Sequence, residues 1–402
     1  MKSRTKALYL TYDGLTDPLG QSQILPYLIG LEQKGWDFSI ISFEKSSTFE
    51  RLKAEVKASI AGKNIEWIPL QYTKQPPVLS TIFDLLRMKY VAQKLDLDRY
   101  ELIHCRSYLT MLVGMRLKRS HRLIFDMRGL WADERVEGKL WPQNALLYRG
   151  IYRYFRKKEA MFFQSADAVI SLTQEGLLAL KERYGDAFNE NKVSVIPCCV
   201  DTAVFETGVT AFRKQEMGFS EDARILMHVG SVGTWYRFDQ ELVFFKALKA
   251  IDSRWCFAIL TGDMPTARAL VKQAKCPEDA IFIKNVNHRE VPQYLKTAEL
   301  SVQFIEPSFS KRASFPVRLV EALAMGVPVV TNAGIGDVAQ ILQEGKAGVV
   351  LSSWNELSEA ALNWSSEHYN RISIRAYAVK KFGLDVGVKQ YANVYHSSGS
   401  YD

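Results

Sequence analysis

The chain has 402 residues, of which 47% are hydrophobic and 24% are charged. This is the composition of a globular protein, and it excludes a collagen, a coiled coil and a largely disordered chain. Its formal net charge is +8. The excess is confined to one half, because residues 1–200 contain 30 basic and 22 acidic side chains and residues 201–402 contain 22 of each. This asymmetry indicates an anionic partner for the first half.

The cysteines and the apolar runs predict a cytoplasmic protein. Five cysteines include no C-x-x-C pair and no metal-binding spacing, so we expect reduced thiols. The apolar run at residues 7–10 is too short for the core of a signal peptide, and no run approaches the 18 residues needed to span a membrane. We expect a chain that can touch the inner face of a membrane without crossing it.

Short apolar runs alternate with helical windows along the whole chain. This alternation predicts an α/β fold with parallel, doubly wound sheets in two Rossmann-like domains, residues 1–200 and 201–380, followed by a C-terminal helical segment, 381–402, that packs back toward the first. The strands expected in the first domain are residues 7–12, 38–43, 101–106, 122–127, 167–173 and 193–197. Those expected in the second are 225–230, 256–261, 281–284, 300–305, 328–331 and 348–351.

The loop after the first strand, residues 13–22, is a candidate ligand loop. Ligands of such sheets bind at the carboxyl ends of the strands. Gly14 and Gly20 allow close backbone approach, and the N–H groups before the next helix attract anions. The loop is neither G-x-G-x-x-G nor a P-loop, so a plain turn is an equally good interpretation.

Residues 310–328 carry the most specific pattern. Ser314 is the expected N-cap of a helix, and Pro316 suits its first turn. Arg318 and Glu321, three residues apart, are expected on the side of the helix away from the apolar residues. The alternative interpretation of this pair is a surface ion pair of little energetic value.

The helix start also gathers positive charge. Lys311, Arg312 and Arg318 beside a helix N-terminus suit a diphosphate, and the Glu321 carboxylate one turn further on can accept hydrogen bonds from two ribose hydroxyls. We therefore favour a nucleotide site over the ion pair.

These residues resemble the donor-binding helix of the GT-B glycosyltransferases, in the large retaining family 4-like type also called glycosyl transferases group 1. Three further stretches are similar to that family: residues 195–201 (VIPCCVD), 229–236 (VGSVGTWY) and 331–337 (TNAGIGD). Gly20, Gln21 and Gly35 fit the start of its acceptor domain more loosely.

The resemblance implies two Rossmann-like domains facing across a cleft, with residues 1–200 binding the acceptor and 201–380 binding a nucleotide-diphosphate sugar. It implies a retaining, metal-independent transfer with no cofactor, in the synthesis of a surface polysaccharide or glycoconjugate. The implied catalytic residues are Asp126, Arg128, Arg318 and Glu321. The implied donor-binding residues are Gly20, Gln21, Gly230, Ser231, Arg237, Lys311, Arg312, Ser314, Pro316, Arg318 and Glu321.

The chain departs from the family in two places. Ala313 stands where the commoner E-x7-E motif has its first glutamate, so the chain resembles the branch with S-x-P-x-K/R before a single Glu. Gly230–Ser231 and Trp235–Tyr236 stand where many members have an Arg and a Lys. The candidates to neutralise the charge of the diphosphate are then Arg318, Lys311, Arg312 and Arg237.

The loop at residues 126–134 also departs from the family pattern, because it lacks the histidine that many relatives place near the donor sugar. Asp126 or Arg128 would take that place. The competing interpretation is a solvated charged loop.

Residues 143–163 are predicted to form an amphipathic helix with Arg149, Arg153 and Lys157 at intervals of four. Such a helix can lie on an anionic membrane that presents a lipid-diphosphate-linked acceptor. The plainer alternative is a helix that packs its apolar stripe on the sheet. No nucleic-acid motif accompanies the charge. Asp96-Leu97-Asp98 is interpreted as a turn, and no metal site is predicted.

Two other functions stay open. One is a nucleotide-sugar 2-epimerase of the same fold, which needs carboxylates and a histidine that the pattern does not place. The other is a non-catalytic nucleotide-sugar-binding partner of a synthase complex, which the missing first glutamate makes credible.

Overall fold

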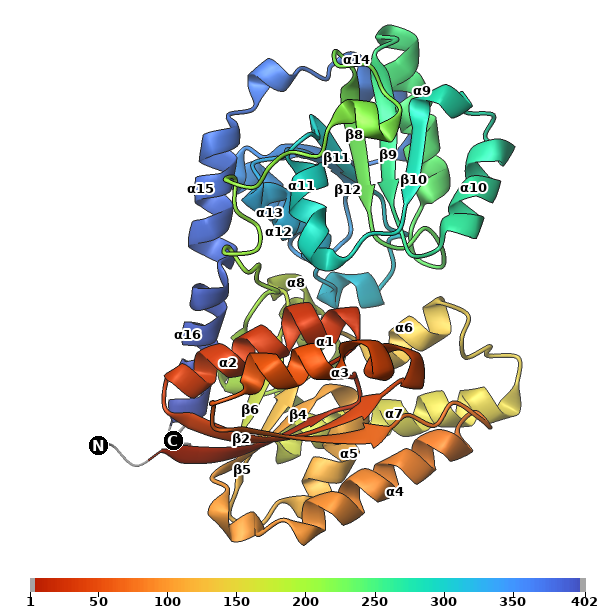
Figure 1. Cartoon of the computed structure of the whole chain (residues 1–402). Coiled ribbons are helices and arrows are strands. Elements are labelled where there is room, and N and C mark those ends of the chain that lie inside the picture. The colour runs from red at the N-terminus through yellow and green to blue at the C-terminus, as the bar shows by residue number, and fades with distance from the viewer. Residues whose placement is uncertain (1–3, 398–402) are drawn as a thin grey trace. The chain divides into compact units, whose positions relative to one another are not determined.

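The computed structural model describes residues 4–397, so residues 398–402 of the predicted C-terminal segment lie outside the described residues. The chain divides into two compact units. Unit 1 contains the residues up to Pro197 together with those from Leu384 onward, and unit 2 is Cys198–Gly383. Figure 1 shows one parallel sheet with covering helices in each unit.

Unit 1 is built on a seven-stranded parallel sheet with the order β3-β2-β1-β4-β5-β6-β7. Its strands are β1 (Thr5–Thr11), β2 (Trp36–Glu44), β3 (Ile65–Gln71), β4 (Leu102–Arg106), β5 (Arg122–Asp126), β6 (Ala168–Ser171) and β7 (Val193–Val195). The buried apolar side chains of β1, β2, β4 and β5 fill the core on both faces, as is usual for a parallel sheet.

Helices cover both faces of this sheet, with α2 and α3 on one side and α4, α5 and α7 on the other (Figure 1). The helices of unit 1 are α1 (Pro18–Gln23), α2 (Leu25–Gln33), α3 (Ser46–Ile60), α4 (Leu79–Lys94), α5 (Ser107–Leu117), α6 (Trp131–Glu137), α7 (Leu146–Ser165), α8 (Gln174–Tyr184) and α16 (Leu384–His396).

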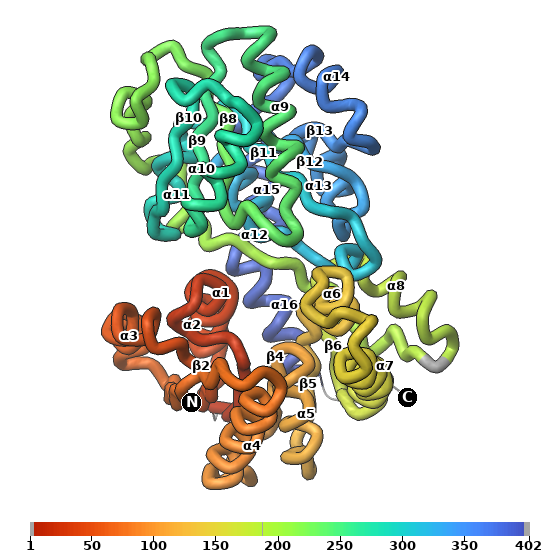
Figure 2. Tube along the Cα trace, turned by 90° about the vertical axis from the view of Figure 1, so that its right-hand side faces the viewer, coloured from red at the N-terminus to blue at the C-terminus, as the bar shows by residue number. Residues whose placement is uncertain are grey.

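Unit 2 repeats the design with six parallel strands in the order β10-β9-β8-β11-β12-β13. The strands are β8 (Arg224–Val229), β9 (Trp255–Leu260), β10 (Ile281–Lys284), β11 (Leu300–Gln303), β12 (Val329–Asn332) and β13 (Gly348–Leu351). The helices are α9 (Phe238–Ile251), α10 (Met264–Gln273), α11 (Val291–Leu295), α12 (Val317–Ala324), α13 (Val338–Gly345), α14 (Leu357–Leu362) and α15 (Arg371–Phe382). Figure 2 follows these elements along the backbone.

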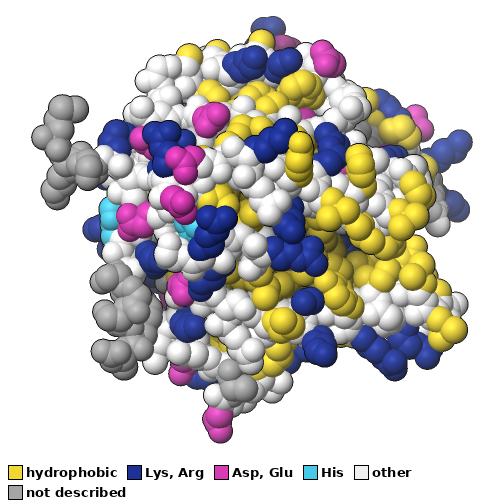
Figure 3. Space-filling model, turned by 90° about the horizontal axis from the view of Figure 1, so that it is seen from below, with side chains coloured by type: hydrophobic (Ala, Val, Ile, Leu, Met, Phe, Trp, Pro, Cys, Tyr) yellow, Lys and Arg dark blue, Asp and Glu magenta, His cyan; other side chains and the backbone are white. Residues whose placement is uncertain are grey.

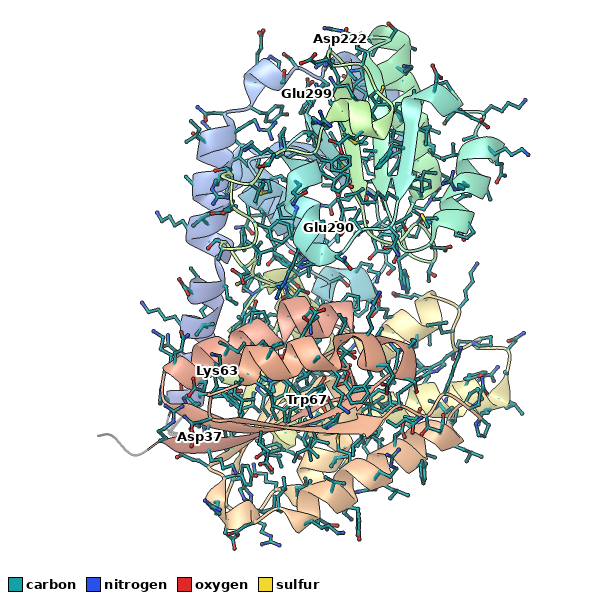
Figure 4. The ribbon with its side chains drawn as sticks, viewed as in Figure 1. Asp37, Lys63, Trp67, Asp222, Glu290 and Glu299 are labelled. Atoms are coloured by element: carbon teal, nitrogen blue, oxygen red, sulfur yellow. The ribbon has the colours of Figure 1, made fainter. Side chains whose placement is uncertain are left out.

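The two parallel, doubly wound sheets confirm the predicted α/β class, and all twelve predicted strands are present. The edge strand β3 was missed. It contains Pro69, and most of its side chains are half-exposed, as is typical of an edge strand rather than a buried core strand. Figure 4 labels its Trp67, whose indole N–H donates to Ser42 Oγ at 2.9 Å.

Two helical predictions change in detail. The expected helix after residues 13–22 is α2, but the second half of the predicted loop is itself helical and forms α1, which ends before Ile24 because Pro26 lies in the first turn of α2. Residues of the predicted C-terminal segment form α16, which packs on α2 of its own unit. Gly30 permits that contact, since a Cβ there would lie 2.6 Å from Val388 Cγ2.

A buried carboxylate holds the loop at residues 13–22. Glu44, 2% exposed at the end of β2, accepts hydrogen bonds from the backbone N–H of Leu15 at 2.8 Å and of Thr16 at 3.1 Å. Gln21 Nε2 donates to Leu15 O at 2.6 Å, within the same loop. Glu44 therefore satisfies the N–H groups of Leu15 and Thr16 from within the chain, and the attraction of an anion to the N–H groups at the helix start stays a prediction.

We predict that Glu44→Gln loosens this loop. The amide would place an NH2 group opposite the N–H of either Leu15 or Thr16, which bind different carboxylate oxygens, and would remove the charge that strengthens both bonds, at a cost of about 2–3 kcal/mol. Hydrogen exchange at these two amides should accelerate. Glu55→Gln, at an exposed position of α3, is the matched control and should exchange like the parent chain. Unchanged protection in Glu44→Gln would contradict the assignment.

Candidate functional site

In unit 2 the loop after β8 meets the start of α12 at the carboxyl ends of the strands. Gly230 has a φ of +123°, a value that favours glycine. A Cβ at this position would lie 3.1 Å from Arg318 Nη1. Glycine therefore lets the guanidinium of Arg318 lie directly on the backbone of this loop.

Arg318 is fixed from three sides. Its Nε donates to Gln303 Oε1 and its Nη1 to Val229 O, both at 3.1 Å, and its guanidinium carbon lies 4.1 Å from the centre of the Tyr236 ring. Arg318 Nη2 and Gln303 Nε2 are buried, yet neither has a hydrogen-bond partner within residues 4–397. Buried donors without a partner also occur elsewhere, as at Trp36 Nε1 and Trp364 Nε1. What distinguishes this pair is its position at the carboxyl ends of the strands, where ligands of parallel sheets bind and could supply acceptor oxygens.

Glu321 does not turn toward Arg318, so the alternative interpretation of these two residues as a surface ion pair is wrong. Its Oε1 lies 2.6 Å from His288 Nε2, and the carboxylate is buried. Burial alone would lower the pKa of His288, but the hydrogen bond and charge of Glu321, helped by Asp201, raise it above its ordinary value. The loop carrying His288 is fixed by a capping box in which Asn287 N donates to Glu290 Oε2 at 2.8 Å; Figure 4 labels Glu290 at the start of α11.

The other predicted cations of unit 2 differ in their surroundings. Lys311 is buried, and its Nζ lies 3.8 Å from the centre of the Trp235 ring. Its carbonyl accepts from Gly336 N at 2.9 Å, which joins the segment at residues 310–313 to the loop at 331–337. Arg312 is half-buried over the ring of Phe309.

Arg237 is less suited to an anion. It donates to Asp239 at 2.8 Å and to Glu306 at 2.7 Å, and these two carboxylates together exceed its single charge. Ser231 is exposed in the same loop. The predicted role of Arg237 toward a diphosphate is therefore the weakest of the four.

The start of α12 differs from its prediction. The helix begins at Val317 with Pro316 as its N-cap, whereas Ser314 has extended backbone and ends the preceding 3₁₀ turn at Ser310–Ala313. The prediction of Ser314 as the N-cap is thus wrong, because Ser314 directly follows the 3₁₀ turn and lies two residues before the actual N-cap, Pro316. The backbone N–H groups at the start of α12 still lie beside Arg318.

In unit 1 a buried charge cluster occupies the carboxyl ends of β4 and β5. Asp126 is fully buried, and its Oδ2 lies 3.1 Å from Tyr391 Oη, 3.4 Å from His104 Nε2 and 3.7 Å from Arg106 Nη1. Arg106 also donates to Asp13 Oδ2 at 3.3 Å. The cluster therefore joins the end of β1, β4, β5 and the C-terminal helix α16.

The charges of this cluster keep Asp126 ionised. Burial opposes ionisation, but the charge of Arg128, the hydrogen bond and charge of His104 and the charge of Arg106 together lower the pKa of Asp126 to about 2. Burial lowers the pKa of His104, although the hydrogen bond and the charge of Asp126 act to raise it. With Asp126 enclosed, Arg128 is the neighbour that reaches toward solvent, since 13% of its side chain is exposed.

The rest of the loop at residues 126–134 is structural. Asp133 is buried and accepts two hydrogen bonds from Arg183, each at 2.9 Å, and one from Tyr152 Oη at 3.0 Å. Glu159 of α7 extends the same network to Arg183. The interpretation of this loop as solvated is therefore wrong at Asp126 and Asp133, both of which are buried.

Sequence reasoning missed four residues of these sites: His104, Arg106, His288 and Gln303. Gln303 and Arg106 end strands, and the rule that strand ends carry function could have found them. His104 lies within a strand and His288 in a short 3₁₀ turn, and neither has a spacing that marks it in the sequence.

The aspartates at 96 and 98 lie at a 3₁₀ turn, where Asp98 pairs with Arg119 at 3.4 Å. Within residues 4–397 no three His, Cys, Asp or Glu side chains gather in a way that could hold a metal ion. None of the helices in that range is both long enough and apolar enough to cross a membrane.

Comparison with known proteins assigns both units to one kind of enzyme. Residues 210–380 match the family Glycosyl transferases group 1, and residues 27–204 match Glycosyltransferase Family 4. An uncharacterized glycosyltransferase of Methanocaldococcus jannaschii is 24% identical over 75% of this chain and 76% of its own length. The N-acetyl-α-D-glucosaminyl L-malate synthase of Bacillus anthracis is 24% identical over 65% of this chain, and the match spans 63% of that protein, less than two thirds.

The solved structures agree on the fold. HepE of Anabaena, crystallised in complex with UDP and glucose, superposes with a TM-score of 0.70 at 15% identity and covers 98% of this chain and 100% of its own. At that identity the likeness shows the fold alone. With the two family matches, it confirms the predicted resemblance: the chain belongs to the group 1 glycosyltransferases of the GT-B fold.

Proposed function

We propose that the protein transfers a sugar, with retention of anomeric configuration and without a metal ion, from a nucleotide-diphosphate sugar to a glycan or lipid-linked acceptor. The observation that carries the proposal is the pair of buried, unpartnered donors, Arg318 Nη2 and Gln303 Nε2. The diphosphate of a nucleotide sugar offers the charged acceptor oxygens that this pair lacks. The complex of HepE with UDP and glucose supports a ligand of this kind.

The ribose is assigned to Glu321. Its Oε1 already accepts from His288, so the carboxylate is held in one orientation and its other oxygen can accept a ligand hydroxyl. His288 thereby acts as a positioning residue for Glu321. This arrangement accounts for a single glutamate at a site where the commoner motif has two.

The reaction would rest on electrostatics. Negative charge grows on the leaving diphosphate as the bond to the sugar breaks, and we expect Arg318, Lys311 and the start of α12 to stabilise it. The diphosphate can itself take the proton of the attacking hydroxyl, which would place the new bond on the face that the leaving group vacates. In unit 1, Asp126 would act through Arg128, with which it forms an ion pair at 3.8 Å.

The acceptor and its location belong to the same proposal. The excess charge of the first half favours an acceptor that carries a lipid diphosphate at the cytoplasmic face of a membrane, as in the synthesis of surface polysaccharides. The basic helix predicted at residues 143–163 is α7, Leu146–Ser165.

A panel of nucleotide sugars tests the function. We expect slow release of free sugar and nucleotide diphosphate from one donor in the absence of acceptor, and unchanged release in the presence of EDTA. NMR of a transfer product should show the anomeric configuration of the donor. Formation of an epimer would instead identify a 2-epimerase, and tight nucleotide binding without any turnover would identify a non-catalytic binding partner.

We predict that Arg318→Ala lowers kcat about 100-fold to 1,000-fold while raising the Kd of the donor much less, because charge on the leaving group develops after binding. Isothermal titration with donor and steady-state kinetics separate the two effects. Arg254→Ala is the matched control, since Arg254 precedes β9 at the opposite ends of the strands. Equal losses in kcat and in affinity would contradict this role and show that Arg318 only binds the donor.

We also predict that Glu321→Gln lowers the pKa of His288. Glu321 is what raises this pKa, and burial, which lowers it, remains in the variant. In the parent chain the protonated pair stabilises unit 2 below the ordinary histidine pKa of about 6.5, and this stabilisation is lost as pH rises through the raised value. NMR titration of the imidazole measures the shift. Glu299→Gln, which breaks an ion pair with Arg224 instead, should leave His288 unchanged.

A further inference from the structure

Unit 1 exposes an apolar face formed by α4 and α7, of which the sequence predicts only the part on α7. Five large side chains of α4 that share one side of the helix are 50–64% exposed: Leu79, Ile82, Phe83, Leu86 and Tyr90. Three of α7 are 45–79% exposed: Leu146, Leu147 and Tyr154. We call these residues the α4–α7 face. Contiguous exposed apolar surface of this kind marks an interaction site on a soluble protein.

The two helices contribute to one continuous surface. Helix α5 contacts both α4 and α7, and its Leu112 and Met115 are half-exposed. Figure 3 views the molecule from below and shows apolar side chains gathered in one broad patch, with Lys and Arg around it and the acidic side chains mainly toward the left of the view.

The charge on this face has one sign. Helices α4 and α7 each contain one carboxylate, Asp84 and Glu159, and both are buried. Helix α5 contains none. The exposed charges of the three helices are all basic: Lys94, Arg116, Arg149, Arg153 and Lys157.

Several cations are held beside the apolar rings. The Arg87 guanidinium lies 5.4 Å from the centre of the Phe83 ring, and Lys94 Nζ lies 4.4 Å from that of Tyr90. A surface that combines aromatic and aliphatic side chains with cations at their edge matches the boundary between headgroups and acyl chains.

We propose that the α4–α7 face docks the protein onto an anionic phospholipid bilayer. A second copy of the chain is a poor occupant, because a symmetric contact would set these cations against one another. Nucleic acid is a poor occupant because its interfaces are polar. The proposal goes beyond the reaction proposed above, and vesicle binding without any sugar donor tests it separately.

Cosedimentation with vesicles of phosphatidylcholine, with and without phosphatidylglycerol, is the test. We expect binding to the anionic vesicles that weakens as salt is raised, and little binding to the neutral ones. The apolar variant Ile82→Ser/Phe83→Ser/Leu86→Ser and the charge variant Arg149→Glu/Arg153→Glu/Lys157→Glu should each weaken binding by about 100-fold or more.

Matched controls lie on unit 2. Val243→Ser/Leu362→Ser/Ile372→Ser changes three exposed apolar residues, and Lys246→Glu/Arg268→Glu/Lys272→Glu reverses three exposed charges. Both should bind vesicles as the parent chain does. All the substituted side chains are exposed, and circular dichroism together with donor turnover checks that each variant folds.

Three results would overturn the proposal. The first is equal binding to neutral and anionic vesicles, or to neither. The second is binding that survives both face variants or is lost in the controls. The third is a dimer in sedimentation velocity that the α4 variant abolishes and vesicles do not displace.

Discussion

A parallel sheet delivers every loop that follows a strand to the same edge, and this constraint places the chemistry of both units. In unit 2 it gathers the ends of β8 and β11 with the start of α12, so Val229, Gln303 and Arg318 meet although they lie far apart in the sequence. In unit 1 it gathers the ends of β1, β4 and β5, so Asp13, Arg106 and Asp126 meet. Charged groups crowded at one edge must be compensated there, since burial of a lone charge is costly.

The two units compensate these charges in different ways. In unit 1 the carboxylate of Asp126 lies among Arg106, Arg128 and Tyr391, so opposite charges face one another inside the unit. In unit 2 the Arg318 guanidinium is held by neutral groups, the side chain of Gln303 and the carbonyl of Val229. Buried polar atoms without a hydrogen-bond partner within residues 4–397 occur in both clusters: Arg106 Nη1 and Asp126 Oδ1 in unit 1, and Arg318 Nη2 and Gln303 Nε2 in unit 2.

The sequence was sufficient for the sheets and for the donor helix because both depend on local patterns. Buried strands are continuous apolar runs, and the segment Ser310–Pro328 combines a helix start, cations and one glutamate within a few turns. The partners of these residues depend on the fold. Nothing near Glu321 in the sequence indicates His288, 33 residues away, and nothing near Asp126 indicates Tyr391, 265 residues away. The edge strand β3 was missed because its half-buried residues do not form the continuous buried run of a core strand. The apolar side of α4 was missed because it resembles the buried side of an ordinary helix, and only the structure shows that it is exposed.

Helix α16 follows unit 2 in the chain, yet it belongs to the first unit. Its Tyr391 and Tyr395 hydrogen-bond Asp126 and His104, and Arg122 at the start of β5 donates to the carbonyls of Val394 and Tyr395. During synthesis the sheet of unit 1 emerges from the ribosome long before these residues do. The charged residues in its core therefore stay partly unpaired until unit 2 has been translated. Unit 1 is synthesised first but completes its folding last.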